Sequence, residues 1–184
     1  MKLNKDFLRY VFILLIVYAV LDYGTYAFIG ITSPDGKYYI SFFDKYLNYV
    51  KALRLIILTG SQLLMSMLGY ETFLLDPYTV KVVNGASVRL VYSCLGYGVI
   101  SFWIAFMVAN KVNVYFKLKW LLIGIFVIIF SNIIRISFLL IANENKWSKV
   151  FDIDHHTVYN IINYVLLIIL IFIFQNQLTK IKKD

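Results

Sequence analysis

The chain has 184 residues, of which 61% are hydrophobic and only 15% are charged. Soluble domains average about 45–50% apolar and about 25% charged residues, so the composition excludes a soluble globular domain and indicates an integral membrane protein. The formal net charge of +8 fits basic residues that flank membrane helices on the cytoplasmic side, and we expect no nucleic-acid partner. The single cysteine, Cys94, excludes an intramolecular disulfide.

Long apolar runs predict membrane-spanning helices. A helix needs about 20 mainly apolar residues to cross about 30 Å of hydrocarbon, where its backbone must satisfy its own polar groups. Five segments approach that length: about 7–30, 53–68, 94–110, 120–142 and 157–175. The sequence therefore predicts an all-α integral membrane protein, a polytopic helical bundle that forms a single membrane domain over residues 1–184.

The first two of these segments need separate interpretation. Segment 7–30 follows Lys2 and Lys5, as the apolar part of a signal peptide follows its basic start, but it is too long and has no small-residue cleavage site. We expect it to be retained as a helix. Segment 53–68 is short and interrupted by polar residues, and the amphipathic stretch 40–54 precedes it. We expect this second segment to lie along or dip into the outer leaflet.

Lysine and arginine residues gather in the short loops that stay in the cytoplasm. By this rule the N-terminus, the link 110–119 and the C-terminal tail lie inside, and segments 70–93 and 143–157 lie outside. An odd number of crossings must then precede Cys94, which also argues against a crossing by segment 53–68. The number of crossings would also be consistent if the N-terminus lay outside, but the N-terminal lysines argue against that orientation. The sequence predicts a multi-pass protein of the cytoplasmic membrane.

A β-hairpin is predicted on the outer side at about 79–92. Two short runs there alternate loosely between apolar and polar residues, and Asn84-Gly85 stands between them. This dipeptide favours a type I′ turn, the tight connection between two antiparallel strands. The hairpin would deliver the chain directly to Cys94.

Arg135 lies well inside the predicted fourth helix. A charged side chain at such a position is costly and usually faces the bundle interior, where it has a function. The alternative is that Arg135 extends its head group to the outer interface. Asn132 stands one turn earlier on the same helix face, and the polar stripe that they form favours the interior position.

A cysteine and two histidines mark the outer ends of two other helices. Cys94 falls at the predicted start of the third helix, where unpaired N–H groups and the helix dipole favour the thiolate, although most single cysteines are inert. His155 and His156 come just before the last helix. Helical spacing aligns His156 with Asn160 and Asn163, so we expect His156 to face inward and His155 to face water or support it.

These residues would meet at one level of the membrane. A cysteine supplies a nucleophile and a histidine can accept its proton. The arginine guanidinium keeps its proton at ordinary pH, so it cannot accept another and serve as a base. It would instead stabilise an oxyanion or hold the substrate. Together, Cys94, His156 and Arg135 are suited to acyl transfer through a thioester.

The same residues resemble the signatures of the exosortase/archaeosortase family. The hairpin ends in Val91-Tyr-Ser-Cys94-Leu-Gly96, the next helix carries Asn132-Ile-Ile-Arg135, and His156 precedes the last helix. They are similar to the Cys-x-Gly, Asn-x-x-Arg and His motifs of that family, in the same order, over roughly residues 50–175. The resemblance implies a polytopic cysteine transpeptidase that cleaves the C-terminal sorting signal of exported proteins and transfers them to a cell-surface acceptor.

The resemblance also implies residue roles. Cys94 would be the acyl-enzyme nucleophile, Arg135 the transition-state stabiliser, and His156 the general base and acid. Asn132, His155 and Asn160 would bind substrate or support the site. Two positions depart from the family pattern, since Leu95 replaces a common serine and Asn160 replaces a common glycine.

Two other classes of function remain open at this point. A small transport or channel subunit would line a polar path with Arg135 and its neighbours, and a non-catalytic assembly subunit would use its polar stripes for helix contacts. We expect no cofactor and no metal; zinc at the paired histidines with Asp152 and Asp154 is the weaker interpretation of that segment. The expected partners are exported proteins with a motif-helix-basic tail and the bilayer, and the acceptor stays unidentified.

Overall fold

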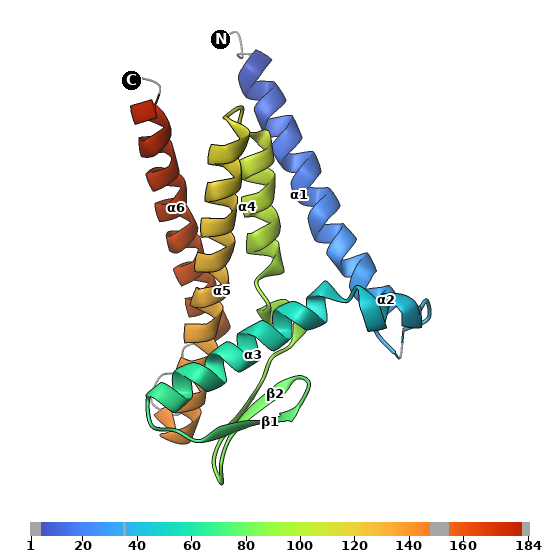
Figure 1. Ribbon diagram of the computed structural model, residues 1–184, viewed down its shortest axis with the longest axis vertical. Helices are drawn as coiled ribbons and strands as arrows, with labels where there is room; N and C mark the ends of the chain where they lie inside the picture. Colours follow the sequence, from blue (N-terminus) through green and yellow to red (C-terminus); the bar gives the residue numbers. More distant parts are fainter. Residues whose placement is uncertain (1–4, 35, 148–154, 182–184) are drawn as a thin grey trace.

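The computed structural model describes residues 5–34, 36–147 and 155–181, with side chains from Asn160 onward in the last of these segments (Figure 1). Four helices run alongside one another and pack in the order α1, α4, α5 and α6. A short α2, a longer α3 and three strands lie near one end of this bundle. The helices are α1 (Lys5–Thr32), α2 (Ser41–Tyr46), α3 (Tyr49–Met67), α4 (Tyr97–Ala109), α5 (Val114–Glu144) and α6 (His155–Ile181).

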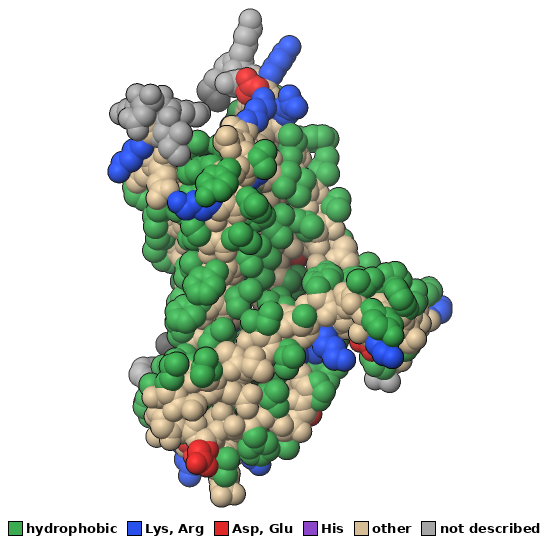
Figure 2. Space-filling view, in the orientation of Figure 1, with side chains coloured by type: hydrophobic (Ala, Val, Ile, Leu, Met, Phe, Trp, Pro, Cys, Tyr) green, Lys and Arg blue, Asp and Glu red, His purple; other side chains and the backbone are tan. Residues whose placement is uncertain are grey.

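The described residues include four stretches that are long and apolar enough to cross a membrane: Lys5–Thr32, Ser41–Met67, Val114–Glu144 and Asn160–Lys180. Helix α4 is apolar but shorter. Large hydrophobic side chains cover much of the outer surface, and on the face shown in Figure 2 the basic side chains lie toward the two ends of the molecule. The structure therefore fits the predicted helical membrane protein.

Helix α3 crosses the end of the bundle steeply instead of running along it (Figure 1). One of its faces packs on α5, where the hydroxyl of Ser61 donates a hydrogen bond to the carbonyl of Ile133 at 3.3 Å and Gly60 lets the Ile133 side chain approach. The chain turns before α3, whose first turn is capped by the side chain of Asn48. Residues 41–67 are apolar enough to span a membrane, but they form two helices instead of one. The inclination of α3 to the bundle helices is compatible with the interfacial position expected for it.

The hairpin expected at 79–92 is present as β2 (Thr79–Val82) and β3 (Ser87–Arg89), which pair antiparallel. The turn differs from the expected type I′, which needs positive φ at both central residues. Asn84 has a φ of 57°, but Gly85 does not lie in that region. Glu144, at the end of α5, accepts a hydrogen bond from the backbone of Ala86 at 2.7 Å, so a wider loop wraps around this carboxylate.

A third strand, β1 (Thr72–Asp76), pairs antiparallel with β2 and gives the order β1-β2-β3. The sequence analysis did not predict it. The carboxylate of Asp76 closes the connection by accepting hydrogen bonds from the backbone of Tyr78 at 2.6 Å and from the hydroxyl of Thr79 at 3.0 Å. These donors stabilise the charged form and hold the pKa of Asp76 below its ordinary value.

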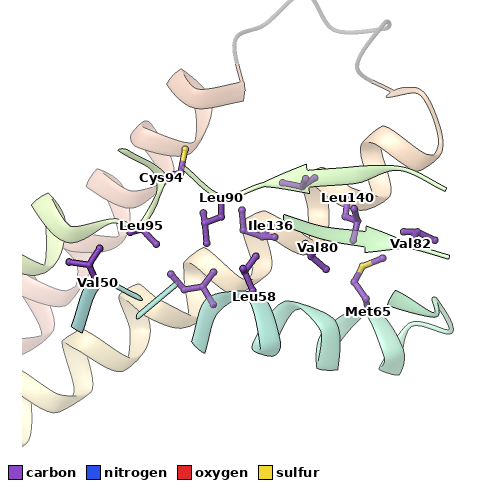
Figure 3. Close-up of a cluster of buried hydrophobic side chains, with 12 residues drawn as sticks. Val50, Leu58, Met65, Val80, Val82, Leu90, Cys94, Leu95, Ile136 and Leu140 are labelled. Atoms are coloured by element: carbon purple, nitrogen blue, oxygen red, sulfur yellow. The ribbon is translucent and has the colours of Figure 1, made fainter. Parts of the chain in front are cut away.

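Two apolar clusters hold the elements together. The first lies between α3, the sheet and α5, and Figure 3 shows Leu58, Leu90 and Ile136 meeting in it. The second joins α4, α5 and α6 nearer the opposite end, and its aromatic members include Trp103, Trp120 and Phe174. A Cβ at Gly124 would overlap the indole of Trp103, so that glycine is what allows α4 and α5 to approach here.

Candidate active site

Residues 91–96 connect the sheet to α4, and we call them the catalytic loop after the role that the sequence predicts for Cys94. Cys94 ends a short 3-10 turn (Tyr92–Cys94), and its backbone N–H donates to the carbonyl of Val91 at 3.0 Å. The expectation that Cys94 begins the third helix is wrong, because α4 starts only at Tyr97. Its amide is already bonded within the turn, so the thiolate-favouring helix start invoked from the sequence does not apply to Cys94.

Gly96 explains why the helix begins late. It has a φ of +74°, a left-handed conformation that favours glycine. A Cβ there would also lie 2.6 Å from Nδ2 of Asn132. The Asn132 side chain is fully buried and donates to the carbonyl of Leu95 at 3.4 Å and to that of Ile128 at 3.3 Å. The Cys-x-Gly and Asn-x-x-Arg motifs therefore meet directly.

Arg135 lies next to the sulfur of Cys94. Nη2 of its guanidinium is 3.5 Å from Sγ, and the side chain is only 8% exposed. Cys94 is itself a buried member of the apolar cluster that holds Leu90 and Leu95, and Figure 3 shows it at the edge of that cluster. The arginine head group therefore lies against the single cysteine of the chain. The burial of Asn132 and Arg135 is the interior position that their shared helix face predicted.

The histidine prediction falls partly outside the described residues. Helix α6 begins at His155, but the side chains of His155 and His156 are not described, nor are residues 152 and 154. Farther along the same helix, Asn163 is buried and accepts a hydrogen bond from the hydroxyl of Ser131 at 3.2 Å. The assignment of His156 as the base stays a prediction.

A cavity of about 430 Å³ lies between α1, α4, α5 and α6. The catalytic loop contributes Ser93 and Gly96 to its wall, and α5 contributes Arg135. Helix α6 contributes Asn160 and Asn163, the residues predicted to share a face with His156. The cavity is thus lined by residues of three separate sequence segments, and one of them, Arg135, contacts Sγ of Cys94.

Sequence reasoning missed Arg54, a second buried arginine. It is 3% exposed, and its guanidinium carbon lies 4.2 Å from the ring centre of Tyr78 and 4.5 Å from that of Tyr92. Burial raises the pKa of Tyr92, but hydrogen bonds from Ser33 and Arg54 outweigh it and leave this pKa below its ordinary value. Arg54 thereby connects α3 to the turn between β1 and β2 and to the catalytic loop. Arg54 also stands within an apolar stretch of the sequence, so the criterion that identified Arg135 would have identified it as well.

Substituting Gly96 by alanine is expected to destabilise the protein by roughly 3 kcal/mol, because a left-handed alanine and its crowded Cβ each add about 1–2 kcal/mol. Gly69→Ala is a matched control. Its φ is +84°, but a Cβ there meets nothing within 4 Å, so it should lose only about 1 kcal/mol. Thermal unfolding in detergent micelles measures both variants. Equal losses would mean that the contact between Gly96 and Asn132 is not tight.

No protein-family model, no curated protein and no solved structure matches the chain. The exosortase resemblance therefore depends on the residues themselves. Its Cys-x-Gly and Asn-x-x-Arg motifs lie more than 30 residues apart in the sequence and in contact in the fold, and Gly96 and Arg135 of these motifs line the same cavity.

Proposed function

We propose that the protein is a membrane-embedded cysteine transpeptidase that cleaves the C-terminal sorting signal of exported proteins and transfers them to a cell-surface acceptor. The observation that carries the proposal is the 3.5 Å contact between Nη2 of Arg135 and Sγ of Cys94. Arg135 lines the cavity, and so do Ser93 and Gly96 on either side of Cys94 in the sequence.

The chemistry follows from these groups. The Cys94 thiolate attacks the scissile carbonyl carbon, and the developing oxyanion is stabilised by the Arg135 guanidinium. The C–N bond then breaks, and the leaving amine takes a proton from His156 in its role as general acid. An acceptor attacks the resulting thioester and gives its proton to the now neutral His156, the C–S bond breaks, and the Cys94 thiolate is restored.

The depth of the site supports a substrate that is cut close to a membrane helix. The 13 residues of α4 span only about 20 Å, which is less than the hydrocarbon thickness of about 30 Å. The catalytic loop above α4 therefore lies below the membrane surface. Irregular backbone at that depth is tolerated where protein buries it or where it lines a cavity, and this loop does both.

The fold also supports the orientation that the lysines predicted. The N- and C-termini lie at one end of the bundle together with the link between α4 and α5, and the sheet lies at the other end (Figure 1). If α1, α4, α5 and α6 cross and α3 does not, both basic termini lie in the cytoplasm, as the positive-inside rule requires. The catalytic loop then faces the outside, where exported substrates are.

This topology predicts opposite labelling of two introduced cysteines. In a Cys94→Ser background, Ser87→Cys in the hairpin is expected to react with a membrane-impermeant thiol reagent in intact cells, whereas Asn113→Cys should react only after permeabilisation. Both positions are exposed in the structure. Labelling of the Asn113 variant in intact cells would place the catalytic loop on the cytoplasmic side and contradict the proposal.

A channel is less well supported than an enzyme. In the part of the chain that the structure describes, the side chains of Trp103, Trp120 and Phe174 pack together between α4, α5 and α6. These side chains are almost completely buried, as in a packed core.

The proposed function is tested by comparing the C-terminal peptides of exported proteins in cells with and without the gene. Mass spectrometry should find a group of proteins that lose a motif-helix-basic tail only when the protein is present. Identical C-termini in the two strains, under conditions where the protein is expressed, would contradict the proposed activity.

A further inference from the structure

Asp22 is an ionisable residue within a membrane-spanning helix that the proposed reaction does not use. Helix α1 has no other charged residue between Arg9 and its end at Thr32. At 1.5 Å per residue, Asp22 lies about 15 Å before that end. Carboxylates at such depth are costly and usually serve a substrate or ion, with a partner of opposite charge.

The described residues provide no such partner for Asp22. Among them, no ion pair and no hydrogen bond reaches its carboxylate; the ion pair that they contain joins Lys111 and Asp6 at a different place. The carboxylate lies over the first turn of α4, where a Cβ at Gly98 would be 3.6 Å from Oδ1. It is only half-buried because it faces the cavity.

The cavity therefore carries charges of both signs on different helices. Arg135 lines it from α5, next to Cys94, and Asp22 lines it from α1. The other polar groups around Asp22 are neutral: Tyr18 and Tyr26 stand one turn before and one turn after it on the same helix and line the cavity as well. An anionic or carbonyl group is suited to the side of Arg135, and a cationic group is suited to the side of Asp22.

We propose that Asp22 binds a cationic nitrogen, a primary ammonium or guanidinium group, of a molecule that occupies the cavity beside Cys94. The ligand supplies the positive charge that the described part of the chain does not. This inference extends the proposed function, since the ligand would be either the acyl donor or the acyl acceptor of that reaction. Asp22 would then be a specificity-determining residue.

The cation site can be tested by chemical modification of Cys94, which needs no catalysis. Cys94 is the only cysteine of the chain, so it is the only thiol that the reagents can modify. The full-length protein in detergent is treated with methanethiosulfonates of similar size that carry a trimethylammonium, a sulfonate or a neutral hydroxyl group. We measure the rate at which each modifies Cys94, and the neutral reagent reports folding and access. In clefts of one charge sign, rates of charged molecules change by about 10–10³-fold. Because this cavity carries charges of both signs, we expect a change near the lower end of that range.

Asp22→Asn is expected to lower the ratio of the cationic to the neutral rate at least about tenfold, the lower end of that range. The matched control is Asp44→Asn, which removes another half-buried carboxylate that is outside the cavity, and it should leave the ratio unchanged. An unchanged ratio in Asp22→Asn would overturn the proposal. This result does not depend on whether Cys94 forms a thioester.

A second measurement distinguishes the two sources of the cation once a substrate is known. If the acceptor carries it, Asp22→Asn should accumulate acyl-enzyme on Cys94, because the thioester forms and is not resolved. If the donor carries it, the variant should form acyl-enzyme more slowly. A variant with wild-type rates for both steps would overturn the role of Asp22 in this reaction.

Discussion

Replacing Arg135 by lysine is expected to slow tail cleavage at least about a hundredfold, within the range of about 10²–10³ that a lost oxyanion donor costs. Lysine keeps the positive charge but not the planar fork with which a guanidinium reaches the sulfur and a developing oxyanion together. In the structure the position is buried and Nη2 is 3.5 Å from Sγ of Cys94. The lysine ammonium has fewer N–H donors and sits on a flexible stem, so it does not reproduce that geometry.

The rate is measured as a single turnover in membranes at matched enzyme levels. Arg89→Lys is the matched control, because Arg89 is exposed on β3 and the same substitution there should leave the rate unchanged. An Arg135→Lys enzyme within about threefold of wild type, well below the range for an oxyanion donor, would mean that any long cation suffices at this position.

Cys94→Ala and Cys94→Ser are both expected to abolish cleavage while the protein remains inserted. The alanine lacks a nucleophile, and the serine hydroxyl is a far weaker acid than a thiol and is not activated by a cation alone. Cys94 is a buried member of the apolar cluster around Leu58 (Figure 3), and because alanine and serine are close to cysteine in size, the protein should still fold with either. Immunoblots of the substrate, at matched enzyme levels, show whether its tail is retained.

The control for the Cys94 variants is Ser66→Ala, an exposed position of α3 that should process normally. A channel or an assembly subunit would tolerate both Cys94 substitutions. Normal tail removal by Cys94→Ala would therefore exclude the thioester mechanism and favour one of those alternatives.

Local patterns in the sequence were enough to predict several features. The alternation around Asn84-Gly85 predicted the hairpin, and the shared helix face of Asn132 and Arg135 predicted their burial. Both predictions depend on residues only a few positions apart, where strand and helix periods apply directly. The type of turn was wrong because Glu144, nearly 60 residues away, binds the loop.

Other features depend on contacts that no local pattern contains. The late start of α4 follows from the contact of Gly96 with Asn132, and the place of Arg54 follows from two tyrosines in different segments. Asp22 is visible in the sequence as a charge in an apolar helix. Its position at the same cavity as Arg135, however, results from the packing of α1 against α4. Such residues are found by asking what each charge in an apolar stretch would contact.

The most direct test of the central claim is to trap the reaction intermediate on Cys94. Membranes containing the wild-type protein and an identified substrate are quenched in acid, and the peptide that contains Cys94 is analysed by mass spectrometry. We predict an added mass equal to the processed C-terminal peptide of the substrate, which hydroxylamine removes as expected for a thioester, and which is absent in Cys94→Ser. A substrate that is fully processed while Cys94 remains unmodified at every quench time would contradict the account.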